Sequence, residues 1–341
     1  MPTFTYPTNA ELTEIAQDKL PALQANRRIF DIMPIEEKDA SVIIWDQLDN
    51  YTGLQSLRGI NGAFPLIQQT GSKQFVERPG YYGEGELIDE IQLTERRQLG
   101  TFAQPVSIDD LVMEKQDKLL NRRLDRIEWI GWTLLTTGQF IVSTPMGIVA
   151  HQGAYTLQTF TASVAWATVA TATPLADFSS VQLLARGHSV NLGATAKAYM
   201  NRVTYNYLRS NTNAADVYGR RVSGLATANN LESINQILLQ DDLPTIVIYD
   251  EGYLNDAGTF VPWIPNNVVV VVGQRPAGQP VAKYIQTRNA NHPTMAPGPF
   301  MWVKNMRGED GNGNAPSVAV YDSHNGGPII QFPSAVVLMR V

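Results

Sequence analysis

The sequence contains no cysteine among its 341 residues. That absence excludes disulfide bonds, thiolate metal sites and cysteine nucleophiles. Long hydrophobic runs are also missing: the longest, such as Val268 to Val272, are strand-sized and too short to span a membrane. The first residues lack the basic stretch and apolar run of a signal peptide. We therefore expect a protein that stays in the cytoplasm where it is made, or leaves by a route other than secretion.

Charge is scarce as well, with 17% of residues charged, a formal net charge of −6 and a pI near 5.3. This balance argues against tight binding of nucleic acid by the chain as a whole. The basic pairs at 27–28, 122–123 and 220–221 are expected to be solvated or salt-bridged. Hydrophobic residues make up 44% of the chain, enough for a sizeable core. The length suggests about two domains.

Motifs for catalysis or cofactor binding are missing too. The chain has no G-x-S-x-G elbow, no G-x-x-x-x-G-K-[ST] phosphate loop and no G-x-G-x-x-G after a strand. No histidine has a second one three or four residues further on, so each is expected to be a surface or strand residue and not a metal ligand. The four are His151, His188, His292 and His324. We therefore expect no metal and no cofactor.

Two groups of polar residues come closest to a site. Asp310, Asn312 and Asn314 alternate as in a calcium loop, but Ala315 stands where a glycine is needed and Tyr321 where a glutamate is needed. A turn between strands is the better interpretation. Four carboxylates flank expected strands without a partner that would make an acid–base pair: Asp241, Asp242, Asp250 and Glu251. The sequence therefore favours a protein that is not an enzyme.

The first half of the chain has two segments without a core of their own. Up to about residue 50 we expect a loosely tethered arm, with an amphipathic stretch at 9–24 that Asn9 caps and Pro21 interrupts, and a strand at 41–45. A glycine- and proline-rich hairpin follows, with turn signals at 69–73 and 79–81. An isolated two-stranded hairpin is only marginally stable in water, so this one is expected to lie on a neighbouring subunit.

The clearest helical pattern runs from Ser107 to Thr136. Ser107 followed by Asp109 and Asp110 is typical of a helix start, apolar residues then recur at helical spacing, and Gly138 ends the pattern. At about 1.5 Å per residue the helix would be roughly 45 Å long. A single long helix with one apolar side is expected to act as a spine.

Strands and short helices alternate in the rest of the chain. Strands are expected within 139–172 and at 245–249, 268–272, 300–303, 317–321 and 335–339, helices at 174–185, 194–208 and 231–239, and an irregular segment at 274–299. The order is mixed and has no βαβ repeat, which predicts an α+β fold.

The order of these features resembles the Hong Kong 97-type capsid fold, and in detail the lambda-type (E-type) major capsid protein family of tailed bacteriophages. Six stretches carry the resemblance: 30–54, 71–81, 191–203, 245–249, 262–273 and 301–339. They include the hairpin with its Glu-Arg-Pro-Gly-Tyr turn and the Pro-Asn-led valine run that ends at Gly273. Each stretch is short, and their joint order over most of the chain is what identifies the family.

The resemblance implies a division of the chain. Residues 1–50 would be the N-terminal arm, and 51–104 the extended hairpin loop. Residues 105–175 and 300–341 would form a peripheral domain with the spine helix at 107–136. Residues 176–299 would form the axial domain.

The same resemblance implies a function. The protein would be a major capsid protein that self-assembles, as hexamers and pentamers, into an icosahedral head shell around double-stranded DNA. It would do so in the host cytoplasm, become part of the virion and enclose the DNA without sequence-specific binding. No contact with a membrane is expected. A separate scaffolding protein is expected because the arm is short, together with a portal and, in some phages, a decoration protein. Cross-linking cannot be inferred from Lys73, since a lysine in a turn is commonplace.

Function is then expected between subunits, at the charged residues of the hairpin and its base. These are Glu77, Arg78, Glu84, Glu86, Glu95, Arg96 and Arg97. They would either form ion pairs across subunits or simply solvate an exposed ribbon, and the sequence favours neither. Two alternatives to a capsid protein are another virion component, such as a tail-tube or decoration protein, and a cytosolic α+β hydrolase built from scattered carboxylates.

Overall fold

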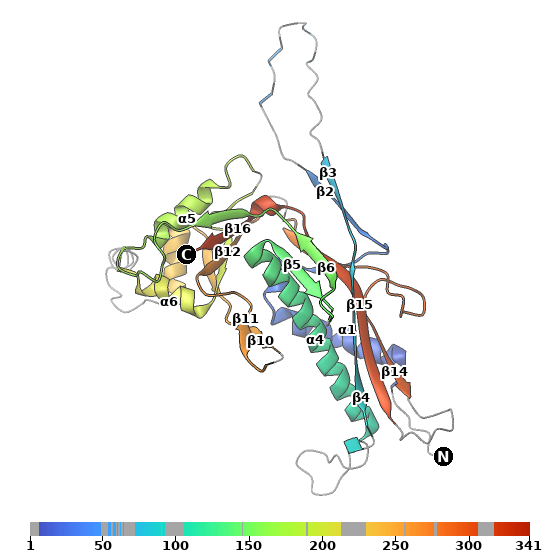
Figure 1. Ribbon diagram of the computed structural model, residues 1–341. Helices are drawn as coiled ribbons and strands as arrows, with labels where there is room; N and C mark the ends of the chain where they lie inside the picture. Colours follow the sequence, from blue (N-terminus) through green and yellow to red (C-terminus); the bar gives the residue numbers. More distant parts are fainter. Residues whose placement is uncertain are drawn as a thin grey trace, which may run out of the picture.

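The computed structural model describes residues 7–48, 54–55, 57–58, 60, 62, 64, 72–89, 91–92, 106–144, 146–188, 190–212, 230–255, 257–275, 278–305 and 317–341. Helices and sheets are both present, which confirms the expected α+β class. Two sheet-containing lobes lie on either side of a long helix (Figure 1).

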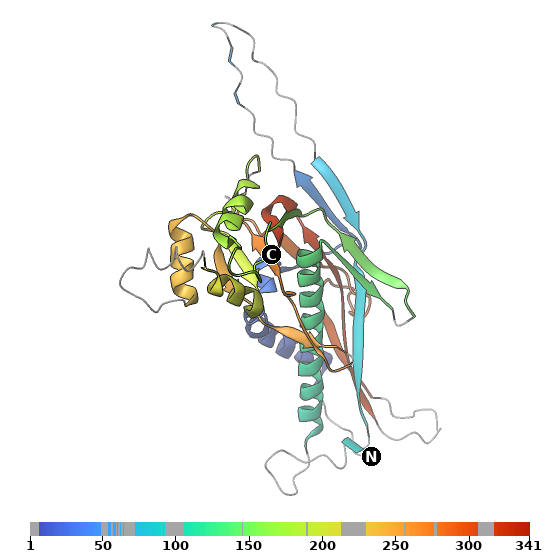
Figure 2. The ribbon, with the colours of Figure 1, turned by 60° about the vertical axis from the view of Figure 1, so that its left-hand side comes forward.

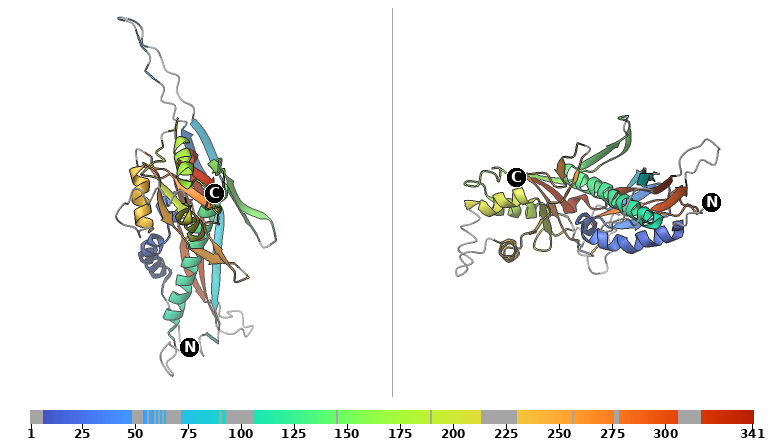
Figure 3. Two further views of the ribbon diagram at one scale, coloured as in Figure 1. Left: turned by 90° about the vertical axis from the view of Figure 1, so that its left-hand side faces the viewer. Right: turned by 90° about the horizontal axis from the view of Figure 1, so that it is seen from below.

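The long helix is α4, Ile108–Thr137, and it confirms the expected spine. The Ser107 hydroxyl accepts a hydrogen bond from the Asp110 N–H, and Gly138 ends the helix with φ of 80°. One side of α4 is buried along its whole length, from Leu111 to Leu135. The helix runs past both lobes and so can pack against each of them (Figure 3).

The first sheet is organised around one long strand, β15 (Val318–Ile330). On one side it pairs with β4 (Gly80–Ile88), and on the other with β14 (Phe300–Asn305) and then β13 (Ala282–Gln286), which also pairs with β1 (Ile35–Glu37). The expected strand at 317–321 is therefore the start of a much longer one. The segment at 274–299, expected to be irregular, contains β13, because its Ala-Lys-Tyr-Ile-Gln run lies between two other strands.

The hairpin differs in its limits from the sequence-based expectation. Its paired strands are β2 (Ile43–Leu48) and β3 (Ser72–Glu77), so pairing begins inside the segment expected to be arm. β4, expected within the hairpin, instead pairs with β15 in the body. We call β2 and β3 together the hairpin; they rise from one end of the body (Figure 1).

The second sheet has the order β7-β16-β12-β8-β9. These strands are Gln158–Thr161, Val336–Arg340, Val268–Val272, Lys197–Met200 and Thr245–Ile248. β7 and β16, expected in the peripheral domain, thus share a sheet with strands of the expected axial domain. Three helices, α5 (Pro174–Leu183), α6 (Arg202–Ser210) and α8 (Leu231–Gln240), cover a core that includes Phe178, Leu208 and Ile237.

The helix expected at 194–208 is wrong in its first half. Residues 197–200 form β8, and α6 begins after Asn201, whose side chain accepts a hydrogen bond from the Thr204 N–H. Ala198 and Met200 are fully buried in β8, which is paired on both sides, so the sheet overrides the local helical pattern. Within 191–203, one of the stretches that carry the family resemblance, the structure has a strand followed by the start of a helix.

The arm is packed more firmly than expected. α1 (Asn9–Ala25) is capped by Thr8, not Asn9, in a capping box with Glu11, and Pro21 lies inside the helix without ending it. Leu12 and Ala16 pack with Leu111 and Leu119 of α4. A short helix, α2 (Ile29–Ile32), then enters the main core.

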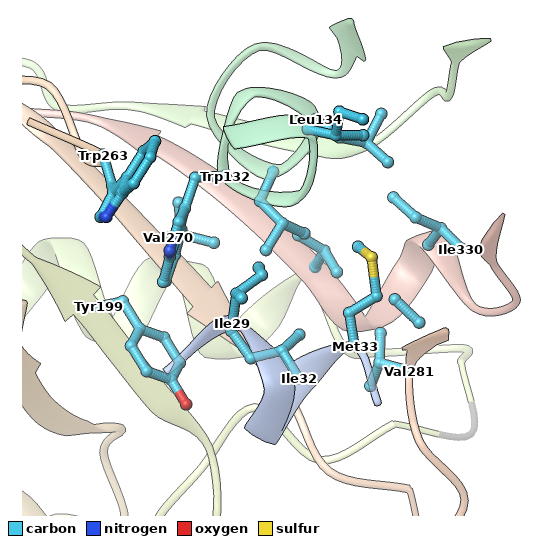
Figure 4. Close-up of a cluster of buried hydrophobic side chains, with 14 of the residues drawn as sticks. Ile29, Ile32, Met33, Trp132, Leu134, Tyr199, Trp263, Val270, Val281 and Ile330 are labelled. Atoms are coloured by element: carbon cyan, nitrogen blue, oxygen red, sulfur yellow. The ribbon is translucent and has the colours of Figure 1, made fainter. Parts of the chain in front are cut away.

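This main core joins the parts of the molecule. Ile29 and Met33 of the arm, Trp132 of α4, Val270 of the second sheet and Ile330 of the first lie in one cluster (Figure 4). Because both sheets and the arm contribute to it, this cluster is where the two lobes meet. Two further ribbons lie at its edge: β5 (Gln139–Ser143) with β6 (Val149–Ala154), and β10 (Gly252–Leu254) with β11 (Phe260–Pro262).

Gly138 offers a test of how α4 is joined to β5. Gly138 has a φ of 80°, and a Cβ added to it would lie 3.1 Å from the Tyr155 carbonyl oxygen. Gly147 has the same φ, but a Cβ added there would have no atom within 4 Å. Gly138→Ala should lower the unfolding free energy by about 1–3 kcal/mol, and by more than Gly147→Ala does. Urea unfolding measures both. Equal losses would show that only the backbone conformation matters.

Candidate assembly interface

The structure separates the seven charged residues proposed at the hairpin. Glu77 is the last residue of β3 and Arg78 follows it, while Glu84 and Glu86 lie on β4 in the body. Glu95, Arg96 and Arg97 lie outside the described residues. The four that are described therefore belong to two different places.

Glu84 and Glu86 form ion pairs with the spine helix of their own chain. Both Glu84 oxygens accept from the Arg122 guanidinium, at 2.5 and 2.9 Å, and hydrogen bonding to Arg122 lowers the pKa of Glu84. Glu86 contacts Lys115 at 3.1 Å and Lys118. Burial acts to raise the pKa of Glu86, but the two ammonium groups outweigh it, and the pKa is lowered. Any contact with another subunit must therefore compete with these internal pairs.

Arg78 is exposed, and no hydrogen bond or ion pair of its side chain occurs among the described residues. It lies between the partly buried Glu77 and the buried Pro79. Of the four, it is the one whose charge has no partner among the described residues.

Glu77 points into the body, where it joins a hairpin-base cluster with Tyr82, His151, Tyr155 and His324. Its Oε2 atom lies within hydrogen-bonding distance of the Tyr155 hydroxyl oxygen, at 3.0 Å, and its Oε1 atom lies 3.9 Å from His151 Nε2. Burial raises the pKa of Glu77 to about 7 and lowers the pKa of His151 to about 4. Glu77 is thus not simply a solvated charge on an exposed ribbon, which is one of the two roles that the sequence leaves open.

Tyr82 brings the two buried histidines together. Its hydroxyl lies 2.5 Å from His151 Nδ1, and its ring stacks on that of His324 at 5.1 Å between centroids. Burial lowers the pKa of His324 to about 3, with a further contribution from the nearby Arg123 and Arg126. Both histidines lie in strands, as expected. Their convergence was not predictable, because 173 positions separate β6 His151 from β15 His324.

A buried ion pair lies next to this cluster and joins α4 to β15. Arg123 Nη1 donates to Asp322 Oδ1 at 2.6 Å, and the side chains are 3% and 6% exposed. The arm is attached to α4 by further ion pairs, the exposed pair of Lys19 with Asp117 at 2.6 Å and that of Arg27 with Asp125 and the buried Glu128. The expectation of salt-bridged basic pairs is confirmed at Arg27, Arg122 and Arg123.

The inner face of the hairpin packs on the body and its outer face does not. Ile43 and Trp45 are buried with Ile285 and Ile329 of the first sheet, whereas the cross-strand pair Ile44 and Val76 is 42% and 64% exposed. The alternation follows from the two-residue period of a strand. The hairpin thus carries an apolar outer face.

Exposed apolar side chains also lie on the other two ribbons. On β5–β6 they are Ile141, Met146, Ile148 and Val149, and on β10–β11 the cross-strand pair Leu254 and Phe260. Figure 2 shows β5–β6 projecting from the body below the hairpin. Apolar groups gathered at the surface in this way usually mark contacts with another protein.

Acids and histidines do not form a site of another kind in the described part of the chain. Asp242 accepts from the Ala194 N–H and Asp250 from the Arg202 N–H, so both hold loops in place. Within the described ranges no group of three His, Asp or Glu side chains could hold a metal ion. No described helix has the length and hydropathy needed to cross a membrane. The calcium-like residues 310–314 lie outside the described residues.

Comparisons with known proteins agree with this geometry. Residues 55–315 match the family model described as phage major capsid protein E. A phage-related protein from Bordetella bronchiseptica RB50 superposes with a TM-score of 0.57 at 11% identity, over 98% of both chains. A candidate prophage capsid protein from Escherichia coli CFT073 superposes with a TM-score of 0.54 at 14% identity, over 95% of this chain and 98% of its own. Curated protein sequences give no significant match. The fold is the Hong Kong 97-type capsid fold.

The buried pair of Arg123 and Asp322 can be tested against an exposed one. Arg123→Met leaves a buried carboxylate without a partner and should lower the unfolding free energy at pH 7 by about 3 kcal/mol or more. The loss should shrink at lower pH, because the unpaired Asp322 can then take up a proton.

The matched control is Lys283→Met, which breaks the more exposed pair of Lys283 with Glu36. It should cost less than about 1 kcal/mol. Urea unfolding between pH 5 and 7 measures both variants. Similar losses for the two would contradict a special role for the buried pair.

Proposed function

Because the chain belongs to the phage major capsid protein E family, whose members form the shell of the phage head, we propose that its copies contact one another through the hairpin and the neighbouring ribbons. The observation that carries this proposal is the two-faced hairpin. One face is anchored in the body, and the other presents Ile44 and Val76 to solvent. A second copy of the chain is the partner that a shell supplies.

The energetics favour such a contact. A two-stranded ribbon gains little stability by itself. Among the described residues, this one contacts the body at its base, where Trp45 stacks on Tyr155 at 6.0 Å and, across the two strands, on Phe75 at 5.3 Å. Burying apolar side chains contributes about 25 cal/mol per Å². A contact made by a few apolar side chains is weak by itself, but several such contacts per copy hold a closed shell together.

Arg78 is the first of the charged candidates to assign to such contacts. Its guanidinium lies at the hairpin base without a partner among the described residues, so an acidic group of another copy can pair with it. Glu84 and Glu86 serve primarily to bind β4 to α4, and a role between subunits would be additional. Glu95, Arg96 and Arg97 remain predictions from the sequence.

The wider assembly is part of the same proposal. We retain hexamers and pentamers, a separate scaffolding protein, a portal, a possible decoration protein and assembly in the host cytoplasm as inferences from the family. The division of the chain also remains an inference: arm 1–50, hairpin loop 51–104, peripheral domain 105–175 and 300–341, and axial domain 176–299. The structure differs from it in pairing β2 with β3, placing β4 in the body and placing β7 and β16 in the second sheet. The net charge of −6 suits a shell that holds double-stranded DNA without binding it tightly. No feature of the described residues favours a tail-tube protein, a decoration protein or a hydrolase.

The loop between the hairpin strands provides the direct test. Leu48 and Ser72 are register partners, so replacing residues 49–71 by Asn-Gly closes the hairpin with a two-residue turn. We expect this variant to fold with an unchanged unfolding midpoint but to form no closed shells by electron microscopy. The wild type, coexpressed with its scaffolding protein, should form them. A wild type that remains a monomer would overturn the proposal.

Deleting a longer segment, residues 60–95, would not isolate the role of the hairpin. It would remove β4, which pairs with nine residues of β15, and so would damage the body as well as the hairpin.

A substitution at Val76 tests whether the outer face of the hairpin is covered by another copy or is merely exposed. Val76→Asp places a charge on the outer face of the hairpin, where it should change the unfolding free energy by less than about 1 kcal/mol. It should nevertheless reduce the yield of closed shells at least tenfold, whereas Val76→Leu should preserve it. Sedimentation of assembled particles measures the yield. Normal assembly of Val76→Asp would show that this face is not covered.

A further inference from the structure

The contacts of Tyr155 at the hairpin base contain one hydrogen too few if Glu77 is ionised. The Tyr155 hydroxyl has a single hydrogen, yet two acceptors lie 3.0 Å from its oxygen: Glu77 Oε2 and the Pro328 carbonyl. If Glu77 is ionised, only one of these contacts can be a hydrogen bond. If Glu77 is a carboxylic acid, it donates to Tyr155, and Tyr155 donates to Pro328.

The geometry around His151 agrees with a neutral pair. Glu77 Oε1 and His151 Nε2 are 3.9 Å apart, and both atoms are buried without another hydrogen-bond partner among the described residues. A carboxylate and an imidazolium would approach to about 2.7–2.9 Å. His151 Nδ1 is free to accept from the Tyr82 hydroxyl at 2.5 Å. The imidazole therefore needs no second proton here.

We propose that Glu77 and His151 hold one proton between them in the docked hairpin, carried by the Glu77 carboxyl group, and that this sharing makes hairpin docking insensitive to pH. When the hairpin is released into water at mildly acidic pH, the carboxyl group ionises and the imidazole becomes protonated. The proton thus changes its site, and the total number of bound protons stays the same.

The sign of each contribution follows from the two shifts. For Glu77, whose pKa rises from 4.5 to about 7 on burial, the stabilisation of docking is complete below pH 4.5 and is lost as the pH rises to 7. For His151, whose pKa falls from 6.5 to about 4 on burial, it is complete above pH 6.5 and is lost as the pH falls to 4. Between pH 4.5 and 6.5 the two slopes are equal and opposite.

The other titratable and charged groups around the pair do not disturb this balance. Burial raises the pKa values of Tyr82, Tyr155 and Tyr284, which therefore stay neutral. Arg123 and Arg126 of α4 stay charged, and Arg123 is paired with Asp322. His151 faces Glu77 of the hairpin through its Nε2 atom, so release of the hairpin uncovers this imidazole. His324 lies instead against Tyr82 of β4 and Tyr284 of β13, so it remains buried whether or not the hairpin is docked.

Hydrogen exchange of the full-length protein tests the proposal in one fixed oligomeric state, so the outcome does not depend on shell formation. Protection of residues 43–48 and 72–77 is measured from pH 4.5 to 6.5 and converted into an opening constant. For the wild type this constant should change less than about threefold.

Two variants should reveal the opposite pH dependences that Glu77 and His151 contribute to hairpin opening. Glu77→Gln keeps a donor for Tyr155 but leaves His151 uncompensated, so the opening constant should rise on the order of a hundredfold as the pH falls from 6.5 to 4.5. His151→Asn keeps an acceptor for Tyr82 and should give the opposite slope. Glu36→Gln, on β1 away from the hairpin, should behave like the wild type.

Two results would overturn the proposal: a wild-type response equal to that of Glu77→Gln, or a Glu77→Gln variant as insensitive to pH as the wild type. If the hairpin exchanges only through global unfolding, the same comparison is made with free energies from urea unfolding. The slopes of the two variants relative to the wild type must then still have opposite signs.

Discussion

The position of the hairpin depends on Tyr155, which is held at both ends. Its backbone N–H donates to the Gly138 carbonyl at the end of the spine helix, and its hydroxyl reaches both Glu77 and the Pro328 carbonyl of β15. One residue thus connects the spine, the first sheet and the hairpin. Since α4 also packs against the second sheet and the arm, a change in its position would be transmitted to the hairpin through short, buried contacts.

Elements whose partners are nearby in the sequence, or whose pattern is unmistakable, could be predicted. α4 has a capping serine, thirty residues of helical spacing and a terminal glycine, and it lies within one residue of the expected limits. The five valines of β12 could hardly be anything but a buried strand. By contrast, β4 alternates glycine with polar residues, which is equally typical of an exposed ribbon. Only its pairing with β15, more than 230 positions away, makes it a body strand.

The candidate interface was predictable in composition but not in arrangement. The sequence shows that charges gather between residues 77 and 97, yet it cannot show that Arg122 and Lys115 lie opposite Glu84 and Glu86. Nor can it show that Glu77 faces inward, since that depends on the register of β2 against β3 and on the packing of Trp45 against Tyr155. A one-residue shift of this register would turn Glu77 to solvent and Val76 to the body.

The division between a firm body and weakly supported ribbons suits a protein that must assemble without associating too early. The extensive apolar contacts lie inside the chain, where the arm, the spine helix and both sheets contribute to one cluster. The apolar groups that stay exposed on the described ribbons, which we propose to contact other copies, include small cross-strand pairs such as Ile44 with Val76 and Leu254 with Phe260. A single such pair is too weak to hold two subunits, but a ring in which every copy makes several closes cooperatively. A neutral, buried hairpin base fits the same requirement, because it keeps the hairpin ready for a neighbour without placing an unpaired charge beneath it.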